Sequence, residues 1–106
     1  MANIEDFKKL EFKVGKVLEV ADHPNADRLY VVKVDLGETQ RQVVAGIKNS
    51  YAKEALIGKQ VIIVTNLDPA VLRGVESQGM ILAATDDTGL AVVTTDKPMK
   101  LGSIVK

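Results

Sequence analysis

The sequence predicts an all-β protein that folds as a single domain. Apolar and polar residues alternate with a period of two along most of the chain, and clusters of turn-forming residues separate the alternating segments. The length of 106 residues suits one core, so we expect one domain over residues 1–106. A hydrophobic fraction of 46% with 26% charged residues is typical of a folded chain and not of a disordered one.

Residues 1–10 depart from the strand pattern and predict a short N-terminal helix. Asn3 is a good N-cap for a helix that ends at Lys9, and the two acidic residues of the first turn suit the helix dipole. Ile4 and Phe7 would share one face of this helix. We expect that face to plug one side of the β structure.

Three strands are predicted in the first half of the chain. Apolar residues fill alternate positions from Glu11 to Val20, and Gly15 indicates a bend. The His-Pro-Asn-Ala-Asp run at 23–27 is a loop by its turn chemistry. A second alternating strand at 30–36 and a third strand at 41–45 follow it.

A short helix and a buried strand come next. Residues 51–57 are rich in helix formers, Ser50 precedes them, and Gly58 stands where a left-handed C-terminal residue belongs. Residues 61–65 show no polar alternation, which indicates a strand buried on both faces. We expect a long loop from 66 to 74, interrupted by a proline.

The fifth predicted strand begins at Gln78, and the Asp-Asp-Thr-Gly run at 86–89 predicts a hairpin turn. Three strands, a helix and two strands is the order of a five-stranded Greek-key barrel of the OB type, whose strand face and loops bind oligonucleotides or sugars. Residues from about 90 to 106 are surplus to that barrel, and 101–105 return as one more strand. This extension would cover a sheet edge or pair with another subunit.

A polar, glycine-flanked turn precedes the fifth strand. Gly74 and Gly79 let the backbone adopt positive φ or approach another molecule closely. Ser77 and Met80 place a hydroxyl and a thioether at the strand entrance. The turn is either a bulged strand start or a ligand contact.

Catalysis finds little support in the residue types present. His23 is the only histidine and there is no cysteine, which argues against a histidine or cysteine metal site and against a serine or cysteine triad. No glycine-rich phosphate loop occurs. We therefore expect a binding module with no catalytic residue, no metal and no cofactor.

Charge and hydropathy limit the partners. Lysine and arginine total 14 and aspartate and glutamate total 14, so a charged partner must meet a local patch. The N-terminus is acidic with no apolar stretch, and the longest apolar runs are too short to span a bilayer. We expect a cytoplasmic protein without a membrane partner.

Basic residues recur on the first three predicted strands, at Lys13, Lys16, Arg28, Lys33 and Arg41, so adjacent strands could share one basic face. Taken singly, each of these basic residues could also be an ordinary exposed charge with no ligand. Proteins that bind single strands usually stack bases on aromatic side chains, but this chain has two phenylalanines, two tyrosines and no tryptophan. A folded RNA, held through backbone, hydroxyls and shape, is the better candidate ligand.

Seven short motifs are spread over nearly the whole chain: Ile4–Phe7, Glu11–Gly15, Asp27–Leu29, Val34–Gly37, Val43–Ile47, Asn66–Pro69 and Gly74–Met80. Together they resemble the tRNA-binding domain family. That family includes free-standing tRNA-binding proteins, the C-terminal or β-subunit domain of methionyl-tRNA synthetase, and a domain of the phenylalanyl-tRNA synthetase β chain. The opening Ile-Glu-Asp-Phe favours the methionyl group, whereas the run His23–Leu29 also resembles the phenylalanyl version.

The resemblance implies a barrel that binds tRNA by its folded shape without reading sequence. It implies an accessory domain or subunit that assists an aminoacyl-tRNA synthetase, most closely the methionyl type, and that does not itself activate amino acids. It also implies a homodimer joined through the C-terminal extension. The alternative is a chaperone-like interaction module on the same barrel, which the complete Ser-Gln-Gly-Met turn disfavours.

The resemblance also assigns candidate contacts with RNA. Arg28 and Lys13 would pair with phosphates, Ser77 and Asn66 would hydrogen-bond phosphate or ribose oxygens, and Met80 would pack against a sugar or a base.

One departure from the family lies after the Asn-Leu-Asp-Pro segment. The family often carries a basic pair there, but Ala70 and Val71 follow Pro69, and only Arg73 restores a charge. We expect a correspondingly modest affinity. The complete candidate set is Lys13, Lys16, Arg28, Lys33, Arg41, Asn66, Arg73, Ser77 and Met80.

Overall fold

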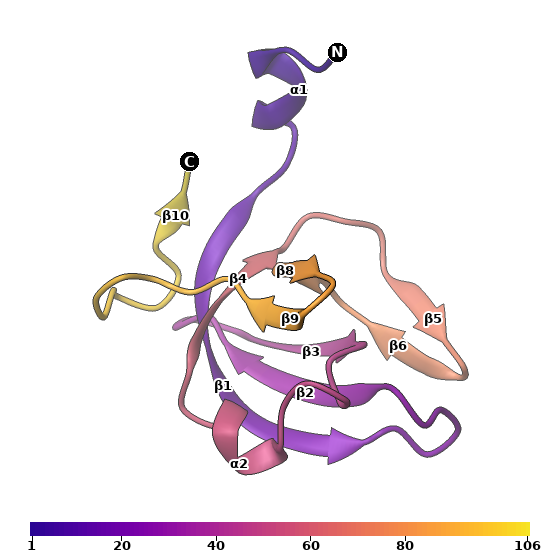
Figure 1. Ribbon diagram of the computed structural model, residues 1–106. Coiled ribbons are helices and arrows are strands. Elements are labelled where there is room, and N and C mark those ends of the chain that lie inside the picture. Colours follow the sequence, from indigo (N-terminus) through magenta and orange to yellow (C-terminus); the bar gives the residue numbers. More distant parts are fainter.

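The computed structural model describes all of residues 1–106 and contains two short helices and ten strands (Figure 1). None of the helices has the length and apolar character needed to cross a membrane. In chain order the elements are α1 (Ile4–Lys8), β1 (Phe12–Asp22), β2 (Tyr30–Asp35), β3 (Gln40–Ala45), α2 (Lys53–Leu56), β4 (Gln60–Val64), β5 (Ala70–Leu72), β6 (Val75–Ser77), β7 (Met80–Ile81), β8 (Ala83–Asp86), β9 (Gly89–Val92) and β10 (Ile104–Val105).

The main sheet is antiparallel and has the strand order β3-β2-β1-β4-β7, with β10 paired to the start of β1. The long strand β1 pairs with β4 and β10 through its first half and with β2 through its second half. A register shift between Val17 and Glu19 accompanies the pairing of β1 with β2. Gly15 is required here because a Cβ atom would collide with the Val34 side chain.

The two ends of this sheet meet, so that it forms a nearly closed barrel, as predicted. The backbone N–H of Gln78 donates to the carbonyl of Gln42 at 2.7 Å, and the N–H of Val44 donates to Ser77 Oγ at 2.9 Å. The Gln42 side chain donates to the Glu76 carbonyl at 2.7 Å. The segment 76–78 therefore takes the place of a regular strand beside β3.

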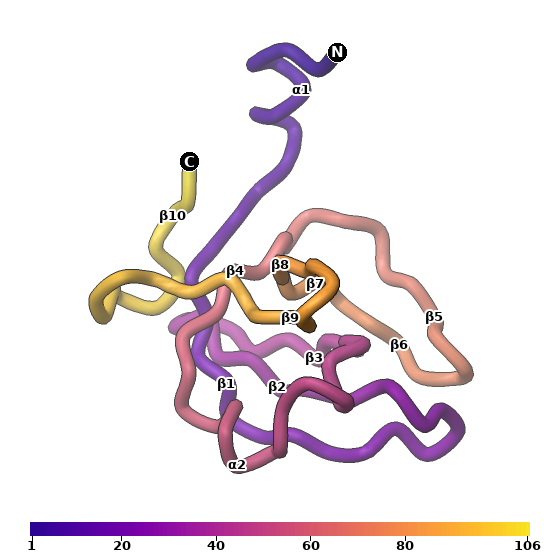
Figure 2. Tube along the Cα trace, viewed as in Figure 1, coloured from indigo at the N-terminus to yellow at the C-terminus, as the bar shows by residue number.

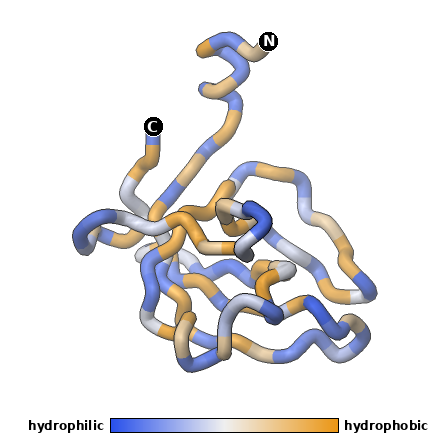
Figure 3. Tube along the Cα trace, in the orientation of Figure 1, coloured by the Kyte–Doolittle hydropathy of each residue, from blue (hydrophilic) through white to orange (hydrophobic).

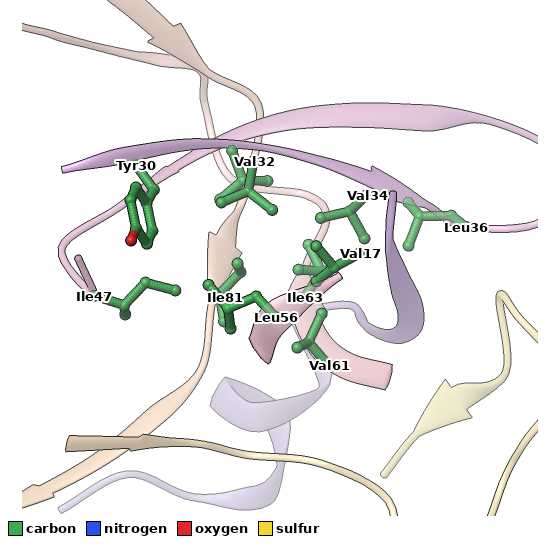
Figure 4. Close-up of a cluster of buried hydrophobic side chains, with 11 residues drawn as sticks. Val17, Tyr30, Val32, Val34, Leu36, Ile47, Leu56, Val61, Ile63 and Ile81 are labelled. Carbon is green, nitrogen blue, oxygen red and sulfur yellow. The ribbon is translucent and has the colours of Figure 1, made fainter. Parts of the chain in front are cut away.

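The core lies inside this barrel, where side chains from β1, β2, β3, β4, α2 and β7 meet (Figure 4). Strand β4 is buried along its apolar length, as the lack of polar alternation predicted. The buried cluster consists of Val17, Tyr30, Val32, Val34, Leu36, Val43, Ile47, Leu56, Val61, Ile63 and Ile81.

The prediction of a long loop at 66–74 is wrong. Strands β5 and β6 form a separate two-stranded hairpin, and its turn residues Arg73 and Gly74 both have positive φ, at 53° and 89°. Two such residues form a type I′ turn, which suits a tight hairpin. Every residue of β5 is exposed, so burial imposed no alternation that a sequence pattern could reveal.

The predicted fifth strand is also interrupted. It begins at Met80 and not at Gln78, since Gln78 and Gly79 lie between β6 and β7, and Leu82 divides it into β7 and β8. A Cβ atom at Gly79 would lie 2.9 Å from the Val64 carbonyl oxygen, so the backbone passes too close to β4 for another residue. The glycine at this strand entrance is therefore required by packing against β4.

Helix α1 forms as predicted but does not plug the barrel. Asn3 and Asp6 cap it reciprocally, yet none of its residues is buried. The helix stands away from the barrel body, at the indigo end of the chain in Figure 1. Phe7 stacks on Phe12 with ring centroids 5.3 Å apart and is 43% exposed, because one turn of helix presents too little apolar area to fill a barrel end.

The second helix and the C-terminal segment follow the predictions more closely. Helix α2 is shorter than expected and begins after Ala52 without a side-chain cap from Ser50, and Gly58 has the predicted left-handed φ of 88°. The predicted turn at 86–89 joins β8 to β9. After β9 the chain passes β4 and reaches the edge of β1 (Figure 2), where β10 covers that edge.

Candidate nucleic-acid interface

The predicted basic residues do not form one continuous face. Arg41 lies opposite Val34, a core residue of β2, whereas Lys33 lies opposite Gln42. Cross-strand partners share a face of the sheet, so Lys33 points outward and Arg41 points toward the inner face. The predicted shared face is therefore wrong for Arg41.

Arg41 instead braces the barrel end. Its Nη1 donates to the carbonyl of Thr65 at 2.9 Å and to the carbonyl of Gln78 at 3.0 Å. These bonds tie β3 to the end of β4 and to the turn before β7. Arg41 also lines a groove described below.

A small polar network continues from this brace to β1. Thr65 Oγ1 donates to Glu11 Oε1 at 2.5 Å, and Lys13 Nζ lies 3.6 Å from the same oxygen. The hydrogen bond from Thr65 lowers the pKa of Glu11 below its ordinary value of 4.5, and Lys13 adds to that shift. The charge of Lys13 is thus partly balanced, while its side chain stays one-third exposed.

A groove of about 750 Å³ runs between the β2–β3 turn and the C-terminal segment. Lys13, Arg41 and Lys100 line it, with Glu38 as the one carboxylate. Lys100 was not among the predicted site residues, because only the return of the C-terminal segment to β1 brings it there. The groove thus carries two more cationic than anionic side chains, which suits phosphate groups.

A second basic region lies where the β1–β2 loop meets the tip of the β5–β6 hairpin. Asn25 Nδ2 in the loop donates to the carbonyl of Arg73 at 3.4 Å, and His23 Nε2 lies 2.8 Å from the carbonyl of Leu72. Arg28 belongs to this loop and Arg73 to the hairpin, and both are exposed. The fold therefore brings these two predicted contact segments side by side.

The other two predicted lysines are ordinary surface groups. Lys33 Nζ lies 4.0 Å from Glu19 Oε2, and both side chains are well exposed, so this pair contributes little stability. Lys16 is exposed and borders a polar hollow of about 370 Å³ beside Lys97. Neither lysine lies in the two regions described above.

Ser77 is buried and its hydroxyl serves the protein's own backbone. It accepts from the Val44 N–H at 2.9 Å and donates its only proton to the Gly79 carbonyl at 2.9 Å. A phosphate needs a donor, so this geometry disfavours the predicted hydrogen bond from Ser77 to RNA. Sequence reasoning could not see this because burial of the hydroxyl depends on β3.

Asn66 and Met80 keep some capacity for a ligand. The Asn66 side chain accepts from the Glu11 N–H at 2.7 Å and donates to the Lys9 carbonyl at 2.7 Å, which holds the linker between α1 and β1. One amide proton of Asn66 remains free for another acceptor. Met80 is 49% exposed. No group of three or more His, Cys, Asp or Glu side chains is placed to hold a metal ion.

Residues 12–104 match the family described as "Putative tRNA binding domain". The chain belongs to this family. It is 59% identical over 102 residues to the methionine–tRNA ligase of Pyrococcus horikoshii. That match covers 96% of this chain but only 14% of the relative, and the homologous region is the C-terminal domain of such synthetases. The methionyl group, which the opening Ile-Glu-Asp-Phe favoured, is thereby confirmed over the phenylalanyl alternative.

Solved structures support the same fold. A MetRS related protein from Pyrococcus horikoshii superposes with a TM-score of 0.92 at 32% identity, covering 100% of this chain and 98% of that one. The chaperone CsaA from Bacillus anthracis superposes with a TM-score of 0.90 at 27% identity, covering 100% and 99%. The barrel thus occurs both in synthetase-related proteins and in a chaperone.

Proposed function

We propose that this domain binds tRNA through its backbone and folded shape, largely independent of sequence, as an accessory module of a methionyl-type synthetase. The observation that carries the proposal is the family match over residues 12–104 together with high identity to a methionine–tRNA ligase. The groove with Lys13, Arg41 and Lys100 and the paired loops with Arg28 and Arg73 supply donors for phosphates. Contacts to phosphates fix position without reading bases.

The aromatic residues support recognition of a folded RNA over an extended strand. Tyr30 is buried and donates its hydroxyl hydrogen to the Tyr51 carbonyl at 2.7 Å, and the Tyr51 hydroxyl accepts from the Val92 N–H at 3.0 Å. Phe7 and Phe12 stack on each other. Base stacking on aromatic rings, which extended strands favour, therefore has few free partners here.

In this proposal the domain makes and breaks no covalent bond. It holds tRNA near a catalytic subunit or domain and so raises the effective concentration of the substrate. Because aminoacylation is a step of translation, the proposed place of action is the cytoplasm.

We further propose that the chain, as one domain, forms a homodimer that covers α1 and β10. Ile4, Phe7, Leu10 and Ile104 are 61%, 43%, 41% and 60% exposed, and Figure 3 shows apolar segments on these parts outside the barrel. An isolated helix this short is only marginally stable, so a covering surface would stabilise it. A second copy can offer the same apolar residues and the same strand edge in return, which gives a two-fold interface.

The chaperone-like alternative is favoured by one observation, the superposition on CsaA over the whole chain. An unfolded client would use exposed apolar surface, whereas tRNA would use the basic groove and loops. The two functions therefore predict different effects of salt, because phosphate binding releases counterions.

The proposal is tested by filter binding of the purified protein to three different tRNAs and to an unstructured RNA of equal length. Similar affinities for the tRNAs, weaker single-strand binding and a log–log salt slope of about −3 to −4 for a dimer with about 4 phosphate contacts are expected. Lys100→Ala should weaken binding, while Lys106→Ala, in the same segment but outside the groove, should not. Absence of tRNA binding even at low salt, with binding of an unfolded client, would favour the chaperone alternative.

A further inference from the structure

His23, the only histidine of the chain, is 5% exposed and lies at the start of the β1–β2 loop. Its Nδ1 accepts a hydrogen bond from the Asn25 N–H at 2.9 Å. A nitrogen that accepts carries no proton, so the neutral ring has its proton on Nε2. Nε2 therefore donates to the Leu72 carbonyl at 2.8 Å, and both nitrogens of the ring have defined roles.

The second bond matters because the hairpin has few other attachments. Strand β5 pairs only with β6 and is exposed along its length. Strand β6 is joined to β3 at its base, through Ser77 and through the Gln42 side chain. For residues 70–74, the hydrogen bonds to the rest of the chain come only from His23 and Asn25.

The same contacts join the two segments that carry exposed arginines. Arg28 follows His23 in the β1–β2 loop, and Arg73 follows Leu72 at the hairpin tip. The two ring nitrogens of His23 bond to Asn25 and to Leu72, so the buried ring links the two segments. Its loss should free the hairpin without disturbing the core.

We propose that His23 is a positioning residue that docks the β5–β6 hairpin on the β1–β2 loop and thereby sets the spacing of Arg28 and Arg73 for two phosphates of the bound RNA. The role in RNA recognition rests on the proposed function, whereas the docking of the hairpin does not. Neither nitrogen of the ring contacts RNA in this arrangement.

Two neutral substitutions separate the two hydrogen bonds of the ring. A glutamine at this position can place its amide N–H near the position of Nε2 and keep the bond to Leu72, as in His23→Gln. An asparagine can place its carbonyl oxygen near the position of Nδ1 and keep the bond from Asn25, but is too short to reach the hairpin, as in His23→Asn. The pair thus tests the link between the segments apart from the structure of the loop.

Amide hydrogen exchange of residues 70–77 is the first readout. His23→Asn should speed exchange there by about three- to tenfold, the range expected for loss of one hydrogen bond, while His23→Gln should stay near the wild type. Exchange in β4 should be unchanged in both variants. If either histidine variant folds poorly, Asn25→Ala provides a second variant, because its position is exposed and it removes only the side-chain bond to Arg73. This variant should also speed exchange at the hairpin tip.

The second readout is tRNA binding over a salt series. His23→Asn should reduce the steepness of the log–log slope by about one unit, because about one phosphate contact is lost, and His23→Gln should restore it. Unchanged exchange of residues 70–77 in His23→Asn and Asn25→Ala would overturn the docking role. Faster exchange with an unchanged salt slope would overturn the role in RNA recognition. If wild-type protein binds no tRNA, the proposed function fails, while the exchange experiment still decides whether His23 docks the hairpin.

Discussion

At the scale of single residues, the polar side chains fall into those that brace the barrel and those that remain free for a ligand. Ser77 donates its one proton to a backbone carbonyl, whereas Arg41 donates from Nη1 to two carbonyls and also lines the basic groove. Without Ser77 the Val44 N–H would lose its partner at a buried site, which typically costs about 1–3 kcal/mol. Arg28 and Arg73, by contrast, are exposed. A residue in a binding motif can therefore act by shaping the site.

The Glu11–Thr65 bond predicts a pH dependence of stability. The pKa of Glu11 is lowered in the folded protein, chiefly by the hydrogen bond from Thr65, so ionised Glu11 stabilises the fold above its unfolded-state pKa. This contribution is lost as the pH falls through the lowered folded-state pKa. Thr65→Val should therefore be less stable than wild type at pH 6, with a smaller difference at pH 3, in urea unfolding. Other acids titrate alike in both proteins, so a difference independent of pH would contradict the prediction.

At the scale of elements, the turn of the β5–β6 hairpin places a cationic residue where its backbone conformation is unfavourable. Arg73 adopts a left-handed φ of 53°, which is strained for most residues but tolerated by asparagine. The cation is thus held at a turn position that would favour Asn or Gly.

Arg73→Asn is expected to change stability and binding in opposite directions. The turn should be relieved of part of its strain, by up to about 1 kcal/mol, and the free energy of unfolding should rise slightly in urea titrations. Affinity for tRNA should fall and the salt slope should lose about one unit with the phosphate contact. Arg73→Lys, which keeps the charge and the strain, is the matched control, and equal tRNA binding by Arg73→Asn and wild type would rule out a contact at this residue.

At the scale of the whole molecule, the nearly closed barrel buries its own core. Helix α1 and strand β10, by contrast, leave apolar side chains exposed. A dimer would place two basic sites on one particle, and two linked sites bind more tightly than one when both can engage.

The proposed dimer is tested by light scattering of a double variant, Phe7→Asp with Ile104→Asp. Two charges in the shared interface should convert the dimer to a monomer, since burying an unpaired charge is costly. Ile57→Asp is the matched control, because Ile57 is 52% exposed and follows α2, away from α1 in Figure 1. A wild-type protein that stays monomeric at all concentrations, or a double variant that stays dimeric, would contradict this arrangement.

The amino-acid sequence alone determined the first three strands with the helix that follows them, the buried strand β4, the Asn3 cap and the turn at 86–89. These features follow from local causes: alternation of apolar residues, capping chemistry and the φ preferences of turn residues. The family motifs also identified the chain correctly.

Only the tertiary structure decided the β5–β6 hairpin, the inward direction of Arg41, the burial of Ser77 and the place of Lys100. Each depends on contacts between segments that are far apart in the sequence, and local residue patterns do not predict such contacts. The link from His23 to Leu72 joins residues far apart in the chain for the same reason. The sequence thus specified the strands β1 to β4 and the family, while closure of the barrel decided which donors face outward.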